Sequence, residues 1–297
     1  MTTAVQVTDP VAGHGEGPVW SDGWGGLRWV DMFAGDVLSL DTTQDDGGVG
    51  TGDKVGRQHV GPLAAALRPR LGGGAVVALE RHFALLDSEQ LASGGSPVVL
   101  GEVWSDPSVR FNDGGCDPDG RFYCGTMAYD ESPGRGALYR LDIDGTVTTV
   151  LEGASISNGL AWSPDGGTAY YVDTHTYRID AFDYTAQSGL SGRRTVVRIE
   201  DGAGGPDGLT VDAEGYVWVA LWGGSAVRRY TPDGRLDGIV ELPVSQVTAC
   251  TFGGTNLDQL FVTTSQQQIE PGSQPAAGAL FSANVGVRGV PVLAYGG

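Results

Sequence analysis

The sequence predicts an all-β protein that folds as a six-bladed β-propeller. One motif recurs along the chain, as EGPVWSDG from Glu16, NDGGCDPDG from Asn112, NGLAWSPDG from Asn158 and DGLTVDAEG from Asp207. Two weaker copies, ALRPRLGGG and TACTFGG, complete the series. Apolar residues almost nowhere recur at helical spacing, whereas short β-rich runs end repeatedly in DG, PDG, AEG or GG. A repeat of this length built from short strands is typical of propeller blades.

Each copy of the motif closes at an anchor glycine, which we expect to lie in a hairpin. Their spacings are 49, 48, 46, 49 and 38 residues, so six anchors predict six blades. The first full copy lacks the position that proline fills in the copies from Asn112 and Asn158, and it closes earlier. In chain order, the anchors are Gly23, Gly72, Gly120, Gly166, Gly215 and Gly253.

A short run of β-branched, aromatic and small residues follows each anchor and predicts a strand. In chain order, these runs are LRWVDM, AVVALE, RFYCGTM, TAYYVDT, YVWVALW and QLFVTT. The 49 glycines and 15 prolines lie between such runs instead of forming a block, so they punctuate hairpins. We see no linker, and we expect residues 1–297 to form a single domain whose core lies between neighbouring sheets.

The charge of the chain excludes some classes of partner. With 36 acidic and 18 basic residues, the formal net charge is −18, and no Lys/Arg cluster offsets it. We therefore expect no binding to nucleic acid or to anionic membranes.

The N-terminal MTTAVQVTDP has no basic start or apolar signal core, and no apolar run has the length of a membrane span. These features predict a soluble, cytoplasmic protein.

The cysteines and histidines form no recognisable catalytic or metal-binding pattern. Cys116, Cys124 and Cys250 are odd in number and widely spaced, which favours packed thiols over disulfides or a thiolate metal site. The four histidines show neither HExxH nor HxH, so a histidine zinc site and a Ser-His-Asp triad are poorly supported. We expect His175 to have a surface or packing role.

Two further strings resemble binding motifs but are better explained as turns. LDIDGT at 141–146 contains DxDG, yet the remaining positions of a calcium loop, including its bidentate glutamate, are absent. LGGGAVV lacks the Lys-Ser/Thr pair of a phosphate loop. We therefore expect a hairpin at each.

The four full copies of the motif place an oxygen-bearing side chain at the same point: Glu16, Asn112, Asn158 and Asp207. In a propeller, equivalent positions at the starts of the inner strands point toward the axis, so these side chains would meet there. Two carboxylates buried together are costly without a cation or ordered water between them. An all-oxygen set favours calcium, magnesium, manganese or zinc. Alternatively, the NG and DG pairs at Asn158 and Asp207 only cap turns.

Several unlinked motifs together resemble the SMP-30/gluconolactonase family, also called the regucalcin family. They span residues 13–295 in the order GEGPVW, RFNDGGCDPDGRFYCGTM, SNGLAWSPDG, PDGLTVDAEGYVWVALW and GALFSANVGVRGVPVLAYG. The resemblance implies a six-bladed propeller with one divalent metal ion near the channel mouth. It also implies hydrolysis of a sugar lactone to the free sugar acid.

The resemblance also implies roles for individual residues. It makes Glu16, Asn158 and Asp207 the metal ligands, with Asp207 also the general base. Arg110 and Asn112, within RFND, match the substrate-binding arginine and asparagine of the family. The implied metal is calcium or zinc, with manganese, magnesium or ferrous iron as alternatives.

One position departs from the pattern of the family. Many relatives carry a glutamate three residues after GTM, where this chain has Asp130, preceded by Tyr129. The resemblance makes Asp130 a substrate-binding residue with a shorter side chain. The substrate is a small-molecule lactone of the hexono or pentono type, which the sequence leaves open.

Three other functions fit parts of the pattern. A non-catalytic calcium-binding regulatory protein would use the same oxygen ligands. A protein-binding propeller scaffold would have no tight metal site. A related metal propeller could hydrolyse an organophosphate or an aryl ester.

Overall fold

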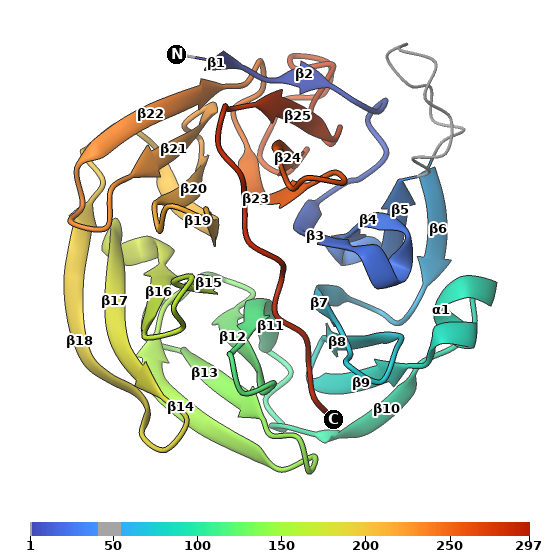
Figure 1. Ribbon diagram of the computed structural model, residues 1–297. Helices are drawn as coiled ribbons and strands as arrows, with labels where there is room; N and C mark the ends of the chain where they lie inside the picture. Colours follow the sequence, from blue (N-terminus) through green and yellow to red (C-terminus); the bar gives the residue numbers. More distant parts are fainter. Residues whose placement is uncertain (1, 41–54) are drawn as a thin grey trace.

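The computed structural model describes residues 2–40 and 55–297, and in this part of the chain the strands form six sheets around a central axis (Figure 1). The chain enters each sheet at the axis and proceeds outward by antiparallel hairpins. The prediction of a six-bladed β-propeller is therefore confirmed. The inner strands of blades 1 to 6 are β3 (Gly15–Ser21), β7 (Ala64–Pro69), β11 (Val109–Cys116), β15 (Ser157–Trp162), β19 (Gly205–Val211) and β23 (Val247–Gly253).

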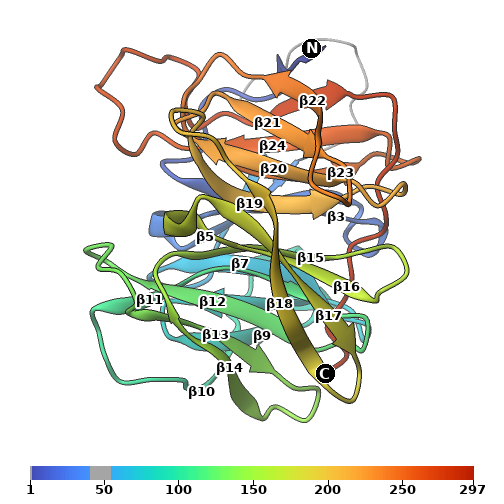
Figure 2. The same cartoon turned by 90° about the vertical axis from the view of Figure 1, so that its left-hand side faces the viewer.

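The remaining strands extend each blade toward its rim. The second strands are β4 (Gly26–Asp31), β8 (Ala75–Leu79), β12 (Phe122–Ala128), β16 (Thr168–Asp173), β20 (Val217–Trp222) and β24 (Gln259–Thr264). The third strands are β5 (Asp36–Leu40), β9 (His82–Leu86), β13 (Gly136–Leu141), β17 (Arg178–Thr185), β21 (Ala226–Tyr230) and β25 (Phe281–Asn284). The outer strands of blades 1 to 5 are β6 (Val55–His59), β10 (Val98–Glu102), β14 (Val147–Ala154), β18 (Gly189–Arg198) and β22 (Leu236–Glu241). Figure 2 shows the ring from its side, with β18 crossing the rim.

The anchor glycines lie at the first hairpin of each blade, or next to it, and each predicted run forms a second strand. Gly120, Gly166 and Gly215 have φ between 73° and 83°, which is left-handed backbone that favours glycine. Near Gly23, in blade 1, a short 3₁₀ turn, η1 (Asp22–Trp24), takes the place of the regular hairpin. The spacing of 38 residues before the last anchor is shorter than the others, but it also separates two successive blades.

The N-terminus closes the ring, which the repeat pattern does not indicate. β2 (Val5–Gln6) pairs antiparallel with β25 and serves as the fourth strand of blade 6. β1 (Thr2–Thr3) pairs parallel with β22 at the edge of blade 5. The two ends of the chain are thus joined through one sheet, in which β2 covers the outer edge of β25.

The core consists of apolar layers between adjacent blades. Within the described ranges there are six hydrophobic clusters, one for each neighbouring pair of blades. Cys116 and Cys124 lie in the cluster between blades 2 and 3, and Cys250 in the one between blades 5 and 6. All three are buried and unpaired, which confirms the prediction of packed thiols.

The C-terminal segment crosses one end of the central channel (Figure 1). The Arg288 carbonyl accepts from Ala213 N–H in blade 5, and Tyr295 N–H donates to Pro69 in blade 2. Gly296 N–H donates to Gly120 in blade 3. These contacts all involve the far ends of inner strands or the hairpins after them. The starts of the inner strands, where the candidate residues lie, face the opposite end.

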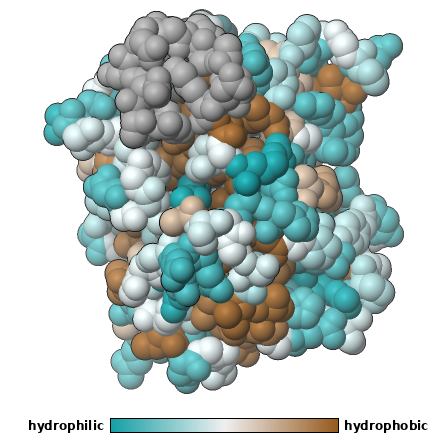
Figure 3. Space-filling view, turned by 90° about the vertical axis from the view of Figure 1, so that its right-hand side faces the viewer, coloured by the Kyte–Doolittle hydropathy of each residue, from teal (hydrophilic) through white to brown (hydrophobic). Residues whose placement is uncertain are grey.

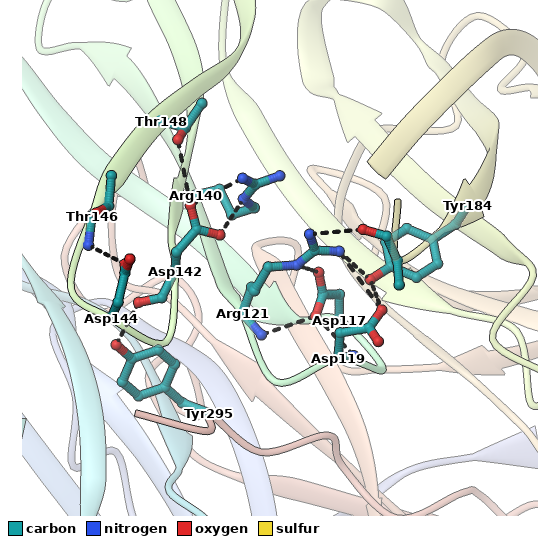
Figure 4. A network of polar contacts seen from close by, with 11 residues as sticks. Asp117, Asp119, Arg121, Arg140, Asp142, Asp144, Thr146, Thr148, Tyr184 and Tyr295 are labelled. Atoms are coloured by element: carbon teal, nitrogen blue, oxygen red, sulfur yellow. Dashed lines mark hydrogen bonds and ion pairs between the residues drawn. The ribbon is translucent and has the colours of Figure 1, made fainter. Parts of the chain in front are cut away.

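The strings LDIDGT and LGGGAVV both form hairpins, as predicted. In the first, Thr146 N–H donates to the Asp144 carboxylate, and Gly145 N–H donates to the Asp142 carbonyl. Figure 4 shows this turn beside the Tyr295 hydroxyl, which donates to the Asp142 carbonyl at 2.9 Å. The second string connects β7 to β8 through Gly73 and Gly74, both with positive φ.

Helices contribute little to the described structure. α1 (Ser88–Ser93) has a capping box on Asp87, and η2 (Met32–Ala34) and η4 (Thr174–Thr176) are single 3₁₀ turns. In the part of the chain that the structure describes, no helix is long and apolar enough to cross a membrane. The outer strand β10 exposes Val98 and Val99, and Figure 3, which views this side, shows apolar patches among polar side chains.

Candidate functional site

The pairing of each inner strand with its neighbour is irregular at one equivalent point. The shift falls between Glu16 and Val19 in blade 1, and at corresponding places in the other five blades. A bulge adds a residue to one strand and redirects its side chains. Asn112, Asn158 and Asp207 lie within these irregular stretches, and Glu16 is the last paired residue before the one in blade 1. Blades 2 and 6 place Ala65 and Thr248 there instead.

The glycines after Asn158 and Asp207 serve close packing at the axis. A Cβ on Gly159 would lie 2.6 Å from Leu209 N and 2.8 Å from Asp207 O in the next blade. A Cβ on Gly208 would lie 2.5 Å from the Ala249 Cβ. Asn158 and Asp207 themselves lie within β15 and β19, so the alternative that they only cap turns is wrong.

A cavity of about 450 Å³ opens at the starts of the inner strands. Glu16, Asn112, Asn158 and Asp207 all contribute to its lining, as does Arg110. All five side chains are buried. The structure therefore brings together the residues that the repeated motif aligns. Other lining residues come from the loops around the mouth: Glu131, Thr174, His175, Tyr177, Trp222 and Gln268.

The acidic residues of this cavity carry unfavourable charge when ionised. Burial raises the pKa of Glu16 well above its usual range, and the charges of Asp207 and Asp113 raise it further. Burial also raises the pKa of Asp207, again with a contribution from Asp113. The sequence analysis missed Asp113, which follows Asn112 on β11 and has no counterpart in the other repeats. Three buried carboxyl groups thus lie near one another at the axis.

Two oxygen atoms of the cavity lack partners in the described chain. Asn158 Oδ1 and Asp207 Oδ1 are both buried and accept no hydrogen bond. Asn158 is oriented by its other amide atom, since Nδ2 donates to Thr174 Oγ1 at 3.0 Å. Leaving such acceptors buried and unpaired is costly, and a bound cation would satisfy both. The donor set of carboxylate and amide oxygens fits a hard divalent cation.

The candidate ligands do not form a cluster of the usual metal-binding residue types. In the described ranges, no group of three or more His, Cys, Asp or Glu side chains is placed to hold a metal ion. Of the predicted ligands, only Glu16 and Asp207 are of these types, and Asn158 supplies an amide oxygen. The fit to a cation therefore depends on that amide and on the unpaired Asp207 oxygen.

Arg110 and Asn112 form a connected pair on β11. Arg110 Nη1 donates to Asn112 Oδ1 at 2.8 Å, and Asn112 Nδ2 donates to the Ser157 carbonyl of blade 4 at 3.1 Å. Arg110 also packs over the ring of Phe33, 5.1 Å from its centroid. Burial lowers the pKa of Arg110 to about 10, so the guanidinium stays charged at neutral pH. The pair presents a fixed positive group beside the acidic residues.

The structure does not place Asp130 in the lining of the cavity, contrary to the role expected for it. The Asp130 side chain is exposed and accepts from Ser132 N–H at 3.0 Å, within its own loop. Glu131 lies in the lining instead. Glu131 has a left-handed φ of 58° and closes a turn in which its N–H donates to the Ala128 carbonyl at 3.0 Å. Position within the motif could not reveal that turn.

Two histidines line the cavity. His175 on η4 is exposed, in agreement with a surface position, yet it also lies at the mouth. His14 is buried and was not singled out by the sequence analysis, although it stands two residues before Glu16. Burial, and then the charge of Arg110, lowers the pKa of its imidazole to about 3, so the ring is neutral at neutral pH. Period-two alternation along the strand could have indicated it.

The fold and the cavity define a six-bladed propeller protein with an oxygen-rich axial pocket. A family model described as the SMP-30/Gluconolactonase/LRE-like region matches residues 14–266, which include every candidate residue. Human regucalcin is 37% identical over 295 residues, covering 95% of each chain. This chain belongs to the SMP-30/gluconolactonase/LRE-like family.

Solved structures agree with this assignment. A luciferin-regenerating enzyme is 30% identical, with a TM-score of 0.86 over 99% of both chains. A calcium-binding protein, regucalcin, from Agrobacterium tumefaciens is 27% identical, with a TM-score of 0.85 over 98% of this chain and 99% of that one. These similarities support a lactonase-like or regucalcin-like function.

Proposed function

We propose that this protein hydrolyses a sugar lactone to the free sugar acid, with the help of one divalent cation. The main support is the convergence of Glu16, Asn158 and Asp207 beside Arg110 and Asn112 in one buried pocket. The name gluconolactonase in the description of the family favours this chemistry. The volume of about 450 Å³ is in the range of small-molecule sites. The acidic pocket also disfavours anionic ligands such as nucleic acid.

Glu16, Asn158 and Asp207 would hold the cation. Calcium and zinc fit this proposal best, with manganese, magnesium and ferrous iron as alternatives. When bound, such an ion supplies Lewis acidity toward a carbonyl oxygen and lowers the pKa of water. It would also offset the repulsion between Glu16 and Asp207.

Three side chains of the pocket would act on the water and the substrate directly. Asp207 would take a proton from the attacking water, while the water oxygen bonds to the lactone carbonyl carbon. The ester C–O bond then breaks, and the former ring oxygen takes the proton from Asp207 and becomes a hydroxyl group. Arg110 would orient polar groups of the substrate and stabilise developing negative charge, because it stays protonated. Asn112, held between Arg110 and Ser157, would bind hydroxyl groups or the ring oxygen.

We propose Glu131 in place of Asp130 as the acidic substrate-binding residue of this loop. Glu131 lies in the lining, and its charge acts on Arg110. A carboxylate at the mouth can accept hydrogen bonds from two hydroxyl groups of a sugar. Asp130 is directed into its own turn.

Calcium binding without turnover is a second candidate function. It is favoured by the regucalcin relatives, one of which is described as a calcium-binding protein. The same three oxygen ligands would serve it. It would give no role to Arg110 as a substrate-orienting group.

Acid release from a lactone panel separates these functions. Chelator-stripped protein is assayed with glucono-, galactono-, arabinono- and xylonolactone, each with and without added calcium, zinc, manganese, magnesium or ferrous iron, and spontaneous hydrolysis is subtracted. We expect turnover that a metal restores. Metal binding by folded protein with no turnover of any lactone would contradict the lactonase proposal and favour calcium binding.

A further inference from the structure

The axial pocket contains a second level of residues, one step nearer to its mouth than the candidate ligands. Residues two apart on a strand face the same side, so the residue two before each candidate position also faces the axis. In blades 1, 3, 4 and 5 these residues are His14, Arg110, Ile156 and Gly205, and all four line the pocket. Blade symmetry therefore relates His14 to Arg110.

The backbone and ring of His14 are held firmly. Asp31 Oδ1 accepts from the N–H groups of Gly13 and His14, each at 3.1 Å. The ring lies between two aromatic side chains, with its centroid 5.1 Å from that of Phe33 and 5.8 Å from that of Trp222. Because the ring packs between these two side chains, the orientation of its Nε2 edge is fixed.

The hydrogen bonds of Ser265 determine what that edge offers. His14 Nδ1 lies 2.7 Å from Ser265 Oγ, and this oxygen also accepts from Gln267 N–H at 2.9 Å. The single hydroxyl proton of Ser265 donates to the Gly13 carbonyl at 3.4 Å. Both acceptor positions of Oγ are then used, one by Gln267 N–H and the other by His14 Nδ1–H. The ring proton therefore lies on Nδ1, and Nε2 is a hydrogen-bond acceptor.

In the described part of the chain, Nε2 of this pocket-lining ring has no hydrogen-bond partner. We propose that His14 is a substrate-contacting residue whose Nε2 accepts a hydrogen bond from a hydroxyl group of the sugar lactone, at the level of Arg110. The substrate class in this inference rests on the proposed function. Because a site built to bond a hydroxyl group discriminates against analogues that lack it, His14 would help to select among lactones.

The proposal is tested on metal-loaded protein with His14→Leu, His14→Gln and, as a matched control outside the pocket, His59→Leu. We expect His14→Leu to lower kcat/KM about 10-fold on the best lactone, since one neutral hydrogen bond is lost. His14→Gln keeps an acceptor oxygen and should retain most activity, and His59→Leu should match wild type. On the deoxy-lactone that lacks the contacted hydroxyl, wild type and His14→Leu should converge.

Nitrogen-15 NMR of the His14 ring provides a readout that does not require turnover. We expect the Nδ1–H tautomer in the folded protein, and a shift of the Nε2 signal on titration with the sugar acid. A wild-type protein that hydrolyses no lactone contradicts the proposed function, and the NMR titration then decides the His14 contact alone. Equal kcat/KM for folded His14→Leu and wild type on every hydrolysed lactone would overturn the inference, as would an Nε2 signal that no lactone or sugar acid shifts.

Discussion

At the level of single residues, Asp207 combines two roles in the proposal, because one carboxylate would both bind the cation and accept a proton. Asp207→Asn separates them, since an amide keeps an oxygen ligand and loses basicity. We expect kcat to fall about 10²- to 10⁴-fold, which is the usual contribution of a general base. Metal binding by calorimetry and a melting curve provide the controls. A variant that binds metal and retains near-normal kcat would remove Asp207 as the base.

The loop after β12 offers a matched pair of acidic residues. Glu131 lines the pocket, whereas Asp130 is bonded within its own turn. We expect Glu131→Gln to raise KM about 10-fold, because hydrogen bonds to a charged group contribute about 1.5–3 kcal/mol. Asp130→Asn should leave KM unchanged. Steady-state kinetics on the best lactone measure both, and the opposite order would restore the original assignment to Asp130.

The residues of the pocket were predictable to different degrees. Glu16, Asn158 and Asp207 follow from the register of the repeat, because equivalent positions in a propeller must face the axis. Glu131 could not be predicted in this way, since it lies in an irregular turn outside the repeated strands. The two-residue alternation along its strand indicates that His14 faces the axis. The sequence does not show that Ser265 lies beside it, because the fold brings these distant residues together.

At the level of structural elements, the bulged inner strands depend on glycine where they approach one another. A Cβ on Gly159 would meet backbone atoms of blade 5 at 2.6 and 2.8 Å, and backbone cannot move aside as a flexible side chain can. We expect Gly159→Ala to destabilise the protein by about 1–3 kcal/mol, as overpacking does. It should also weaken metal binding, because Asp207 O is one of the atoms in contact.

Gly101 provides the control for this substitution. It lies on the outer strand β10, where an added Cβ has nothing within 4 Å. Gly101→Ala should change the free energy of unfolding by less than about 0.5 kcal/mol. Chemical denaturation of both variants measures the difference. Equal stability for the two would show that the axis tolerates a methyl group, contrary to the packing described above.

The blades themselves were predictable because each is a local unit of consecutive hairpins. The closure of the ring was not, because it depends on a pairing between distant parts of the chain. β2 is two residues long and pairs with β25, and MTTAVQVTDP carries no copy of the motif. The C-terminal segment likewise contacts blades 2, 3 and 5 through backbone groups, which leave no pattern in the sequence.

At the level of the whole molecule, the two ends of the central channel differ in kind. At one end, the segment from Val290 to Leu293 covers a cavity of about 80 Å³ lined by the far ends of the inner strands. The other end opens into the larger pocket with its buried acids. The C-terminal segment crosses the first end, so the larger pocket at the other end is where we expect substrate to enter. The acidic pocket thus becomes a confined site in which a cation would be partly shielded from water.

The stability of the whole protein should therefore depend on the cation. A ligand present at 100 times its Kd stabilises the folded state by about 2.7 kcal/mol, so adding metal to chelator-stripped protein should raise Tm. Glu16→Gln should have opposite effects in the two states. Without metal it removes one buried charge that Asp207 repels, and Tm should equal or exceed that of wild type. With metal, Glu16→Gln should reduce the metal-induced rise in Tm, because a charged ligand is lost. Thermal melts of both proteins with and without each ion measure this crossover, and an equal metal-induced rise in Tm would place the cation elsewhere than at Glu16.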